Sequence, residues 1–372
     1  MQRATQAVVH LALLPLFLGA LACGQDPSHP AAAGMPPVAA DDNDDSLDLG
    51  VDGSAEAAAC VGVEAQAVPL PVDLFAVVDR SGSMGDATLT GVSKWYATKM
   101  AFHDFLEHAP RGMGFGLSLF PVPGVASSCA TSYYREQALP IADVEARIRG
   151  VEARFDAAPP DGSTPTAPAL TAALELAQSY ALAHVDRSVV VVLATDGLPT
   201  SCSPTDTAAL AQLAKAALEG PAHVRTLVVA SRSLDEMDLS GLEQIAAAGG
   251  TGRSLVIDPH ADFAKQLRGA LSAAAARDVA CDLALPEPPT GSHLDYDAVN
   301  VVVDGADGRV VLPRVSGPTA CTSNGGWYYD VDPDKGAPSR LDMCKSSCER
   351  AGAQANAESA LRVELGCKSL VR

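Results

Sequence analysis

A carboxylate and two hydroxyl side chains follow one apolar run of this sequence at alternating positions. The run spans residues 74–78 and predicts a buried parallel strand, and Asp79, Ser81 and Ser83 come directly after it. Side-chain oxygens are the ligands that hard cations such as Mg²⁺ prefer. The pattern therefore predicts a metal site where this strand ends.

Two further segments supply side chains of the same kind. A second apolar run at 189–194 ends in Asp196, and the polar loop 162–166 contains Thr164. Ligands of open α/β sheets bind beyond the carboxyl ends of the strands, where strand order reverses. Each residue alone has an ordinary interpretation, as a helix cap or a turn residue. Only their joint order predicts one shared site.

The elements that must position these side chains alternate along the chain. Between residues 71 and 278, apolar runs predict strands, and stretches with helical spacing predict helices. Such alternation is typical of a doubly wound, mostly parallel α/β sheet covered on both faces. The strands are expected at 74–78, 115–120, 189–194, 226–230 and 254–257, and helices at 170–177, 210–218 and 263–274.

The set Asp79, Ser81, Ser83, Thr164 and Asp196 resembles the metal-ion-dependent adhesion site of von Willebrand factor type A domains. The resemblance implies six strands in the order 3-2-1-4-5-6, with an antiparallel edge strand near 135–141. It implies that the serine hydroxyls ligate the cation, that Thr164 does so directly or through water, and that the two carboxylates hold coordinated waters. The implied cation is Mg²⁺, with Mn²⁺ or Ca²⁺ as alternatives, and the implied ligand is a protein that presents an acidic side chain.

The amino terminus is typical of an exported protein. Residues 1–22 combine Arg3 with a short apolar stretch, as in a signal peptide, and Cys23 stands where a bacterial lipoprotein carries its lipid. We expect a lipid-anchored protein of the bacterial cell envelope, and Gly24 favours the outer membrane. Ordinary secretion is the alternative. The acidic segment 23–59 is predicted to be a disordered tether.

Nine cysteines fit an exported chain, because Cys23 leaves an even number for disulfides. A bridge between Cys129 and Cys202 is one pairing that the sequence leaves open, since both follow predicted strands. We expect a type A domain at 60–280 and a small, β-rich, disulfide-containing module at 281–372. Zinc binding by Cys344 and Cys348 is the alternative to disulfides there.

Charge and missing motifs exclude other classes of function. The net charge of −19 argues against nucleic acid and against docking on anionic lipid, which leaves the lipid anchor as the membrane contact. No phosphate-binding loop, dinucleotide motif or nucleophile elbow occurs, and the spacing of His103, Glu107 and His108 fits no metalloprotease. We therefore expect an adhesion or protein-binding function rather than an enzyme. A structural role, in which the metal only stabilises the fold, and a hydrolase whose active site escapes recognition are the alternatives.

Overall fold

The computed structural model describes ten segments of the chain, all of which lie within one compact unit. They are residues 63–88, 90–124, 129–231, 239–258, 261–279, 282–287, 293–305, 308–352, 361–366 and 369–371. The predicted signal peptide (1–22), the predicted tether (23–59) and the predicted lipidation site Cys23 lie outside these segments. So do Cys60, Cys281 and Cys367.

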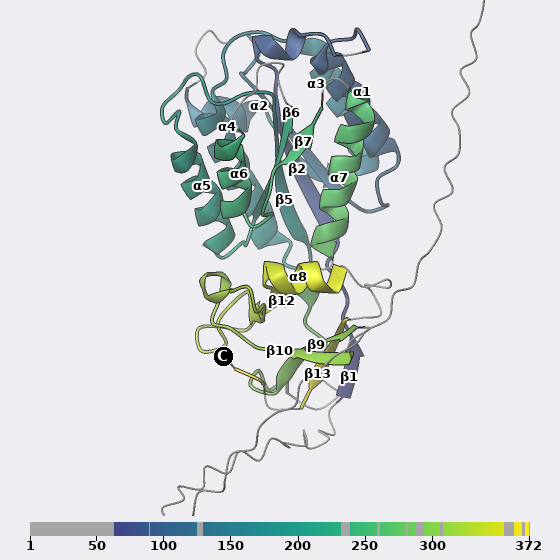
Figure 1. Cartoon of the computed structure of the whole chain (residues 1–372), viewed down its shortest axis with the longest axis vertical. Coiled ribbons are helices and arrows are strands. Elements are labelled where there is room, and N and C mark those ends of the chain that lie inside the picture. The colour runs from purple at the N-terminus through teal and green to yellow at the C-terminus, as the bar shows by residue number, and fades with distance from the viewer. Residues whose placement is uncertain are drawn as a thin grey trace, which may run out of the picture. The chain divides into compact units, whose positions relative to one another are not determined.

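A six-stranded sheet forms the centre of the first part of the fold (Figure 1). Its strands are β2 (Val72–Asp79), β3 (Gly114–Phe120), β4 (Leu139–Asp143), β5 (Ser188–Thr195), β6 (Arg225–Ser231) and β7 (Leu255–Ile257). The spatial order is β4-β3-β2-β5-β6-β7, and only β4 is antiparallel. Numbered within this sheet alone, the order is 3-2-1-4-5-6, so the predicted topology and the antiparallel edge strand are confirmed.

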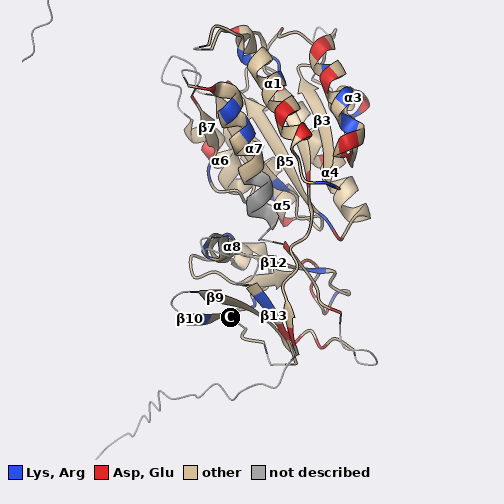
Figure 2. Ribbon diagram, turned by 90° about the vertical axis from the view of Figure 1, so that its right-hand side faces the viewer, with Lys and Arg blue, Asp and Glu red and all other residues tan. Residues whose placement is uncertain are grey.

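The sheet is covered by helices on both faces, each with its own apolar core. One core packs α1 (Lys94–Glu107), α3 (Val144–Ala157) and α7 (Phe263–Val279) against the sheet. The other packs α2 (Thr131–Gln137), α4 (Thr166–Ala183), α5 (Thr207–Glu219) and α6 (Ser240–Ala248) against the opposite face. Strands β2 and β5 are buried along their whole length, because both of their faces are covered. Charged residues gather on the outward surfaces of helices such as α3 (Figure 2).

Within the described residues, the C-terminal module contains two small antiparallel sheets, one α-helix and a short 3-10 helix (Pro318–Ala320). The four-stranded sheet has the order β1 (Val63–Gln66), β13 (Leu361–Leu365), β9 (Val299–Gly305) and β10 (Gly308–Leu312). The three-stranded sheet has the order β11 (Trp327–Tyr329), β12 (Arg340–Met343) and β8 (Asp282–Ala284). Helix α8 (Lys345–Gly352) follows β12. Trp327 is fully buried and packs edge-on against Tyr329, as expected for the aromatic core of a small module.

One strand of this module comes from the other end of the chain. Strand β1 pairs with β13 in antiparallel register, so that Val63 lies opposite Leu365. From the sequence, residues 60–70 are expected in the type A domain, and β1 is not predicted. The module therefore contains residues that come before the six-stranded sheet in the sequence as well as residues that come after it.

The described cysteines form disulfides and do not form a zinc site. Cys129 is joined to Cys202, the pairing that the sequence left open, and Cys321 is joined to Cys344. Cys348 is also disulfide-bonded. The zinc alternative for Cys344 and Cys348 is therefore wrong, because neither residue has a free thiolate.

A buried cluster of charged residues connects the six-stranded sheet with the C-terminal module. Arg225 of β6 donates two hydrogen bonds of 2.6 Å to the carboxylate of Asp282 in β8, which Ser188 of β5 also contacts. Arg340 of β12 donates to Asp342 and to the carbonyl of Ala222. Burial alone would raise the pKa of Asp282, but the Arg225 guanidinium holds it well below its usual range.

Candidate metal centre

The site is built at the carboxyl end of β2, between β3 and β5. Asp79 is the last residue of β2 and lies opposite Phe120 of β3, and its neighbour Val78 lies opposite Ala194 of β5. From β2 the chain continues to β3 on one side and later to β5 on the other. Asp79 and Asp196 therefore lie where strand order reverses, the position at which sheets of this kind bind ligands.

The Asp79 carboxylate is buried and held at both oxygens. The backbone N–H of Ser81 donates to Oδ1 at 2.7 Å, and the Thr195 hydroxyl donates to Oδ2 at 2.6 Å. Burial raises the pKa of Asp79 to about 6; the hydrogen bonds from Thr195 and Ser81 oppose this shift, and the Asp196 charge adds to it. The cost of burying this carboxylate therefore exceeds what these hydrogen bonds return.

Asp196 is connected to the two serines and to one lysine. The Ser83 hydroxyl donates to Asp196 Oδ1 at 2.8 Å, and the hydroxyl oxygens of Ser81 and Ser83 lie 3.1 Å apart. The Lys94 ammonium donates to Asp196 Oδ2 at 2.8 Å. Four of the five predicted residues therefore form one connected group of side chains.

Thr164 belongs to a loop that is attached to this group through the backbone. The N–H of Gly82 donates to the carbonyl of Gly162 at 3.0 Å, which places the two loops against each other. Gly162 has a φ of 82°, a left-handed conformation that favours glycine. Thr164 itself is buried and exchanges hydrogen bonds with Thr200 through its N–H and carbonyl.

The donor set fits a hard divalent cation. The five side chains offer two carboxylates and three hydroxyls, and Mg²⁺ or Mn²⁺ prefers such oxygen donors over nitrogen or sulfur. Asp79, Ser81, Thr164 and Asp196 are buried, whereas Ser83 is exposed, so the group opens to solvent at one side. Within the described residues, no group of three or more His, Cys, Asp or Glu side chains could hold a metal. That result is compatible with a site that relies on hydroxyls.

Three residues of this group escaped the sequence analysis: Lys94, Thr195 and Thr200. The position of Lys94 could have pointed to its role, because it is the first residue of α1 after the N-cap Ser93. A cation is unfavourable at a helix N-terminus, so its presence there indicates a nearby carboxylate. Its side chain is almost fully buried and lies 3.7 Å from the exposed carboxylate of Asp86 in addition to Asp196.

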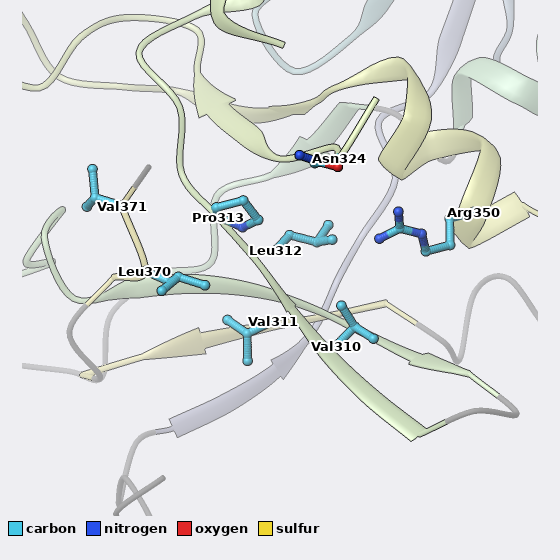
Figure 3. A pocket seen from close by; sticks show the side chains of 8 residues that line it. All are labelled: Val310, Val311, Leu312, Pro313, Asn324, Arg350, Leu370 and Val371. Atoms are coloured by element: carbon cyan, nitrogen blue, oxygen red, sulfur yellow. The ribbon is translucent and has the colours of Figure 1, made fainter. Parts of the chain in front are cut away.

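Two other places within the described residues lack comparable chemistry. A hollow of about 400 Å³ in the C-terminal module is lined mainly by apolar side chains of β10 and its surroundings, and Arg350 extends from α8 toward it (Figure 3). His103 lies on the surface of α1 and pairs with Glu152 and Glu107. Neither place offers a set of oxygen donors like that at β2 and β5.

No family model matches this sequence, and a search of curated proteins gives no match. Solved structures with a similar fold include a von Willebrand factor type A protein from Catenulispora acidiphila, with 15% identity and a TM-score of 0.41 over 81% of this chain and 59% of that one. The pilus adhesin SpaC from Lactobacillus rhamnosus GG has 13% identity and a TM-score of 0.42 over 80% and 39%. The manganese-loaded TRAP protein of Plasmodium vivax has 15% identity and a TM-score of 0.36 over 62% and 94%. The chain thus spans less than two thirds of the first two structures.

The strand order, the antiparallel edge strand and the helices on both faces are those that the sequence resemblance to von Willebrand factor type A domains implied. Among the described helices, none has both the length and the apolar character that a membrane span requires.

Proposed function

We propose that this protein is a lipid-anchored protein of the bacterial cell envelope that binds a protein ligand through a divalent cation. The cation would be held by Asp79, Ser81, Ser83, Thr164 and Asp196, and Mg²⁺ or Mn²⁺ fits these donors. The observation that carries the proposal is the connected group of oxygen donors at the switch point of the sheet, open to solvent at Ser83.

The chain's own residues support binding rather than bond-breaking chemistry. Hydrogen bonds from Ser81 and Thr195 fix the Asp79 carboxylate, and those from Ser83 and Lys94 fix Asp196. A divalent cation in this setting would supply an electrophilic position for an anionic oxygen such as a partner's carboxylate. Among the described residues, the hydroxyls of Ser81 and Ser83 contact each other and Asp196, and no histidine is seen to contact either of them. We therefore propose a binding protein and not an enzyme.

Titration calorimetry with Mn²⁺ and Mg²⁺ tests this function. The purified wild-type protein should bind close to one equivalent, while Asp79→Ala should show no saturable binding, because the variant lacks one of the two carboxylates. Asp156→Ala, which removes an exposed carboxylate of α3 that pairs with Lys99, is the matched control and should bind like wild type. A folded wild type that binds neither ion would contradict the proposal.

The alternative is a structural role in which the metal only stabilises the loops. Capture of envelope proteins in Mn²⁺ and in chelator separates the two, with Ser83→Ala as the comparison. If a ligand binds at the metal, its capture should require Mn²⁺ and be lost in Ser83→Ala, whose metal-free thermal stability should stay near that of wild type. Capture that is the same in Mn²⁺ and in chelator, and the same for wild type and Ser83→Ala, favours the structural role.

A further inference from the structure

A buried lysine lies directly against the proposed metal centre. Lys94 is 3% exposed, and its ammonium group donates to Asp196 Oδ2 at 2.8 Å. The Asp196 side chain is itself fully buried. Burying an ammonium group is costly unless a carboxylate lies next to it. The ion pair is thus a built part of the site and not a chance surface contact.

The surrounding charges show what this ammonium group does. Asp79 and Asp196 are buried carboxylates of the same donor set, and the charge of Asp196 makes the ionisation of Asp79 more costly. Arg80 is also near, but its guanidinium donates to the carbonyls of Pro121 and Pro159. Asp86 lies 3.7 Å from the ammonium group on the solvent side and is exposed. Among the described residues, Lys94 is the cation that contacts a carboxylate of the set.

We propose that Lys94 is a built-in counter-ion that competes with the divalent cation for the charge of Asp196. This inference rests on the proposed function. The Lys94 ammonium balances the site when no metal is bound, so that the loops keep their arrangement. The same positive charge repels an incoming divalent cation, which weakens the affinity and keeps the metal exchangeable. With both cations present, the site carries more positive charge toward an anionic ligand.

The test is the Mn²⁺ affinity of Lys94→Met beside that of Lys99→Met. Lys99 lies on the same helix and pairs with the exposed Asp156, so its replacement makes the same change in charge away from the site. We expect Lys94→Met to bind Mn²⁺ at least about tenfold more tightly than wild type, because one repelling charge is lost. Lys99→Met should bind like wild type.

Thermal unfolding gives a second readout of the same idea. Without metal, Lys94→Met should unfold at a lower temperature than wild type, because a buried carboxylate has lost its ion pair. Saturating Mn²⁺ should raise its unfolding temperature by more than it raises that of wild type. Lys94→Gln, which keeps an N–H donor but removes the charge, serves if the methionine variant does not fold, and should shift both quantities in the same direction.

The possible results separate this inference from the proposed function. Affinities of Lys94→Met and Lys94→Gln that equal or fall below that of wild type would overturn the inference and leave the metal centre standing. If Mn²⁺ binds to the Lys94 variants but not to wild type, the inference is supported, because Lys94 then takes the place of the metal in the native protein. The same result would overturn the proposed function. Absence of binding to every variant and to wild type would overturn both.

Discussion

At the scale of single residues, the centre is governed by carboxylates that are buried within one connected group. Asp79 and Asp196 are 0% and 3% exposed, and their oxygens accept hydrogen bonds from hydroxyl groups, from a backbone amide and from the Lys94 ammonium group. Hydrogen bonds compensate part of the desolvation cost, but the raised pKa of Asp79, about 6, shows that some of this cost remains. A metal ion would relieve this cost by supplying positive charge.

The metal-free stability of the protein should therefore depend on pH through Asp79. Because its folded pKa is about 6, above the ordinary value of 3.8, the folded state holds this proton more tightly than the unfolded chain. The stability that this proton contributes is complete below pH 3.8 and is lost as the pH rises through 6. At pH 7 the ionised carboxylate costs on the order of 2–3 kcal/mol.

Comparison of wild type with Asp79→Asn isolates this effect. The asparagine variant should gain stability relative to wild type as the pH rises from 4 to 7, measured by urea unfolding in the presence of a chelator. Other acids titrate in both chains and cancel in the difference. A difference in the free energy of unfolding that stays constant over this range would contradict the assignment.

The five site residues could be predicted from the sequence, because oxygen-bearing side chains occur at the ends of two predicted strands and in one polar loop. It did not reveal the partners that hold them. Thr195 contacts Asp79 from 116 residues away, and Lys94 contacts Asp196 from 102 residues away. Such contacts depend on the order of strands in space, which a single sequence does not state. The metal-binding role of the five residues stays a prediction.

At the scale of elements, the loop after β5 is held by a disulfide in addition to backbone hydrogen bonds. Cys202 follows β5, and its bond to Cys129 closes a loop over a sequence separation of 73 residues. The hydroxyls of Ser163 and Ser201 lie 2.7 Å apart and join this loop to the one that carries Thr164. The loops that surround the centre are thus cross-linked to one another.

Removal of this disulfide should weaken the protein and loosen these loops. The double variant Cys129→Ser with Cys202→Ser should lose about 2–4 kcal/mol in the free energy of unfolding, since a long loop is no longer closed in the unfolded chain. Hydrogen exchange should become faster in the segments around residues 129–137 and 198–206. In the control, Cys321→Ser with Cys344→Ser, faster exchange should appear in the C-terminal module instead. Unchanged exchange around the centre would contradict this expectation.

The regular elements differ in how well a sequence can reveal them. The strands of the large sheet were predicted within a few residues, because long apolar runs are required where both faces are buried. Strands β1, β8 and β12 were missed, since each has only three or four residues and little alternation. In the C-terminal module, the strands β9, β10, β11 and β13 agree with the β-rich character that the sequence predicts for this part of the chain.

At the scale of the whole molecule, the buried cluster around Asp282 ties the two parts of the fold together. It joins residues of β5 and β6 to residues of β8, and Arg340 reaches back to the carbonyl of Ala222. Charged groups in an interface of this kind depend on one another, because removal of one partner leaves the other buried without compensation.

Replacement of Asp282 by asparagine should therefore destabilise the protein by about 3–5 kcal/mol. The Arg225 guanidinium would remain buried after losing the carboxylate that accepts two of its hydrogen bonds. The double variant Arg225→Met with Asp282→Leu removes both charges and should lose clearly less. Equilibrium unfolding in urea measures all three, and a double variant that is as unstable as Asp282→Asn would contradict the explanation.

The pairing of β1 with β13 makes the four-stranded sheet depend on contacts between segments that are far apart in the sequence. Gln66 lies opposite Arg362, which is roughly 300 residues further along the chain, so a long loop must close before the two strands can pair. The large sheet can form from segments that are closer in sequence. A chain that stops before residue 361 lacks the strand between β1 and β9. Only a chain that extends through β13 can therefore complete the four-stranded sheet.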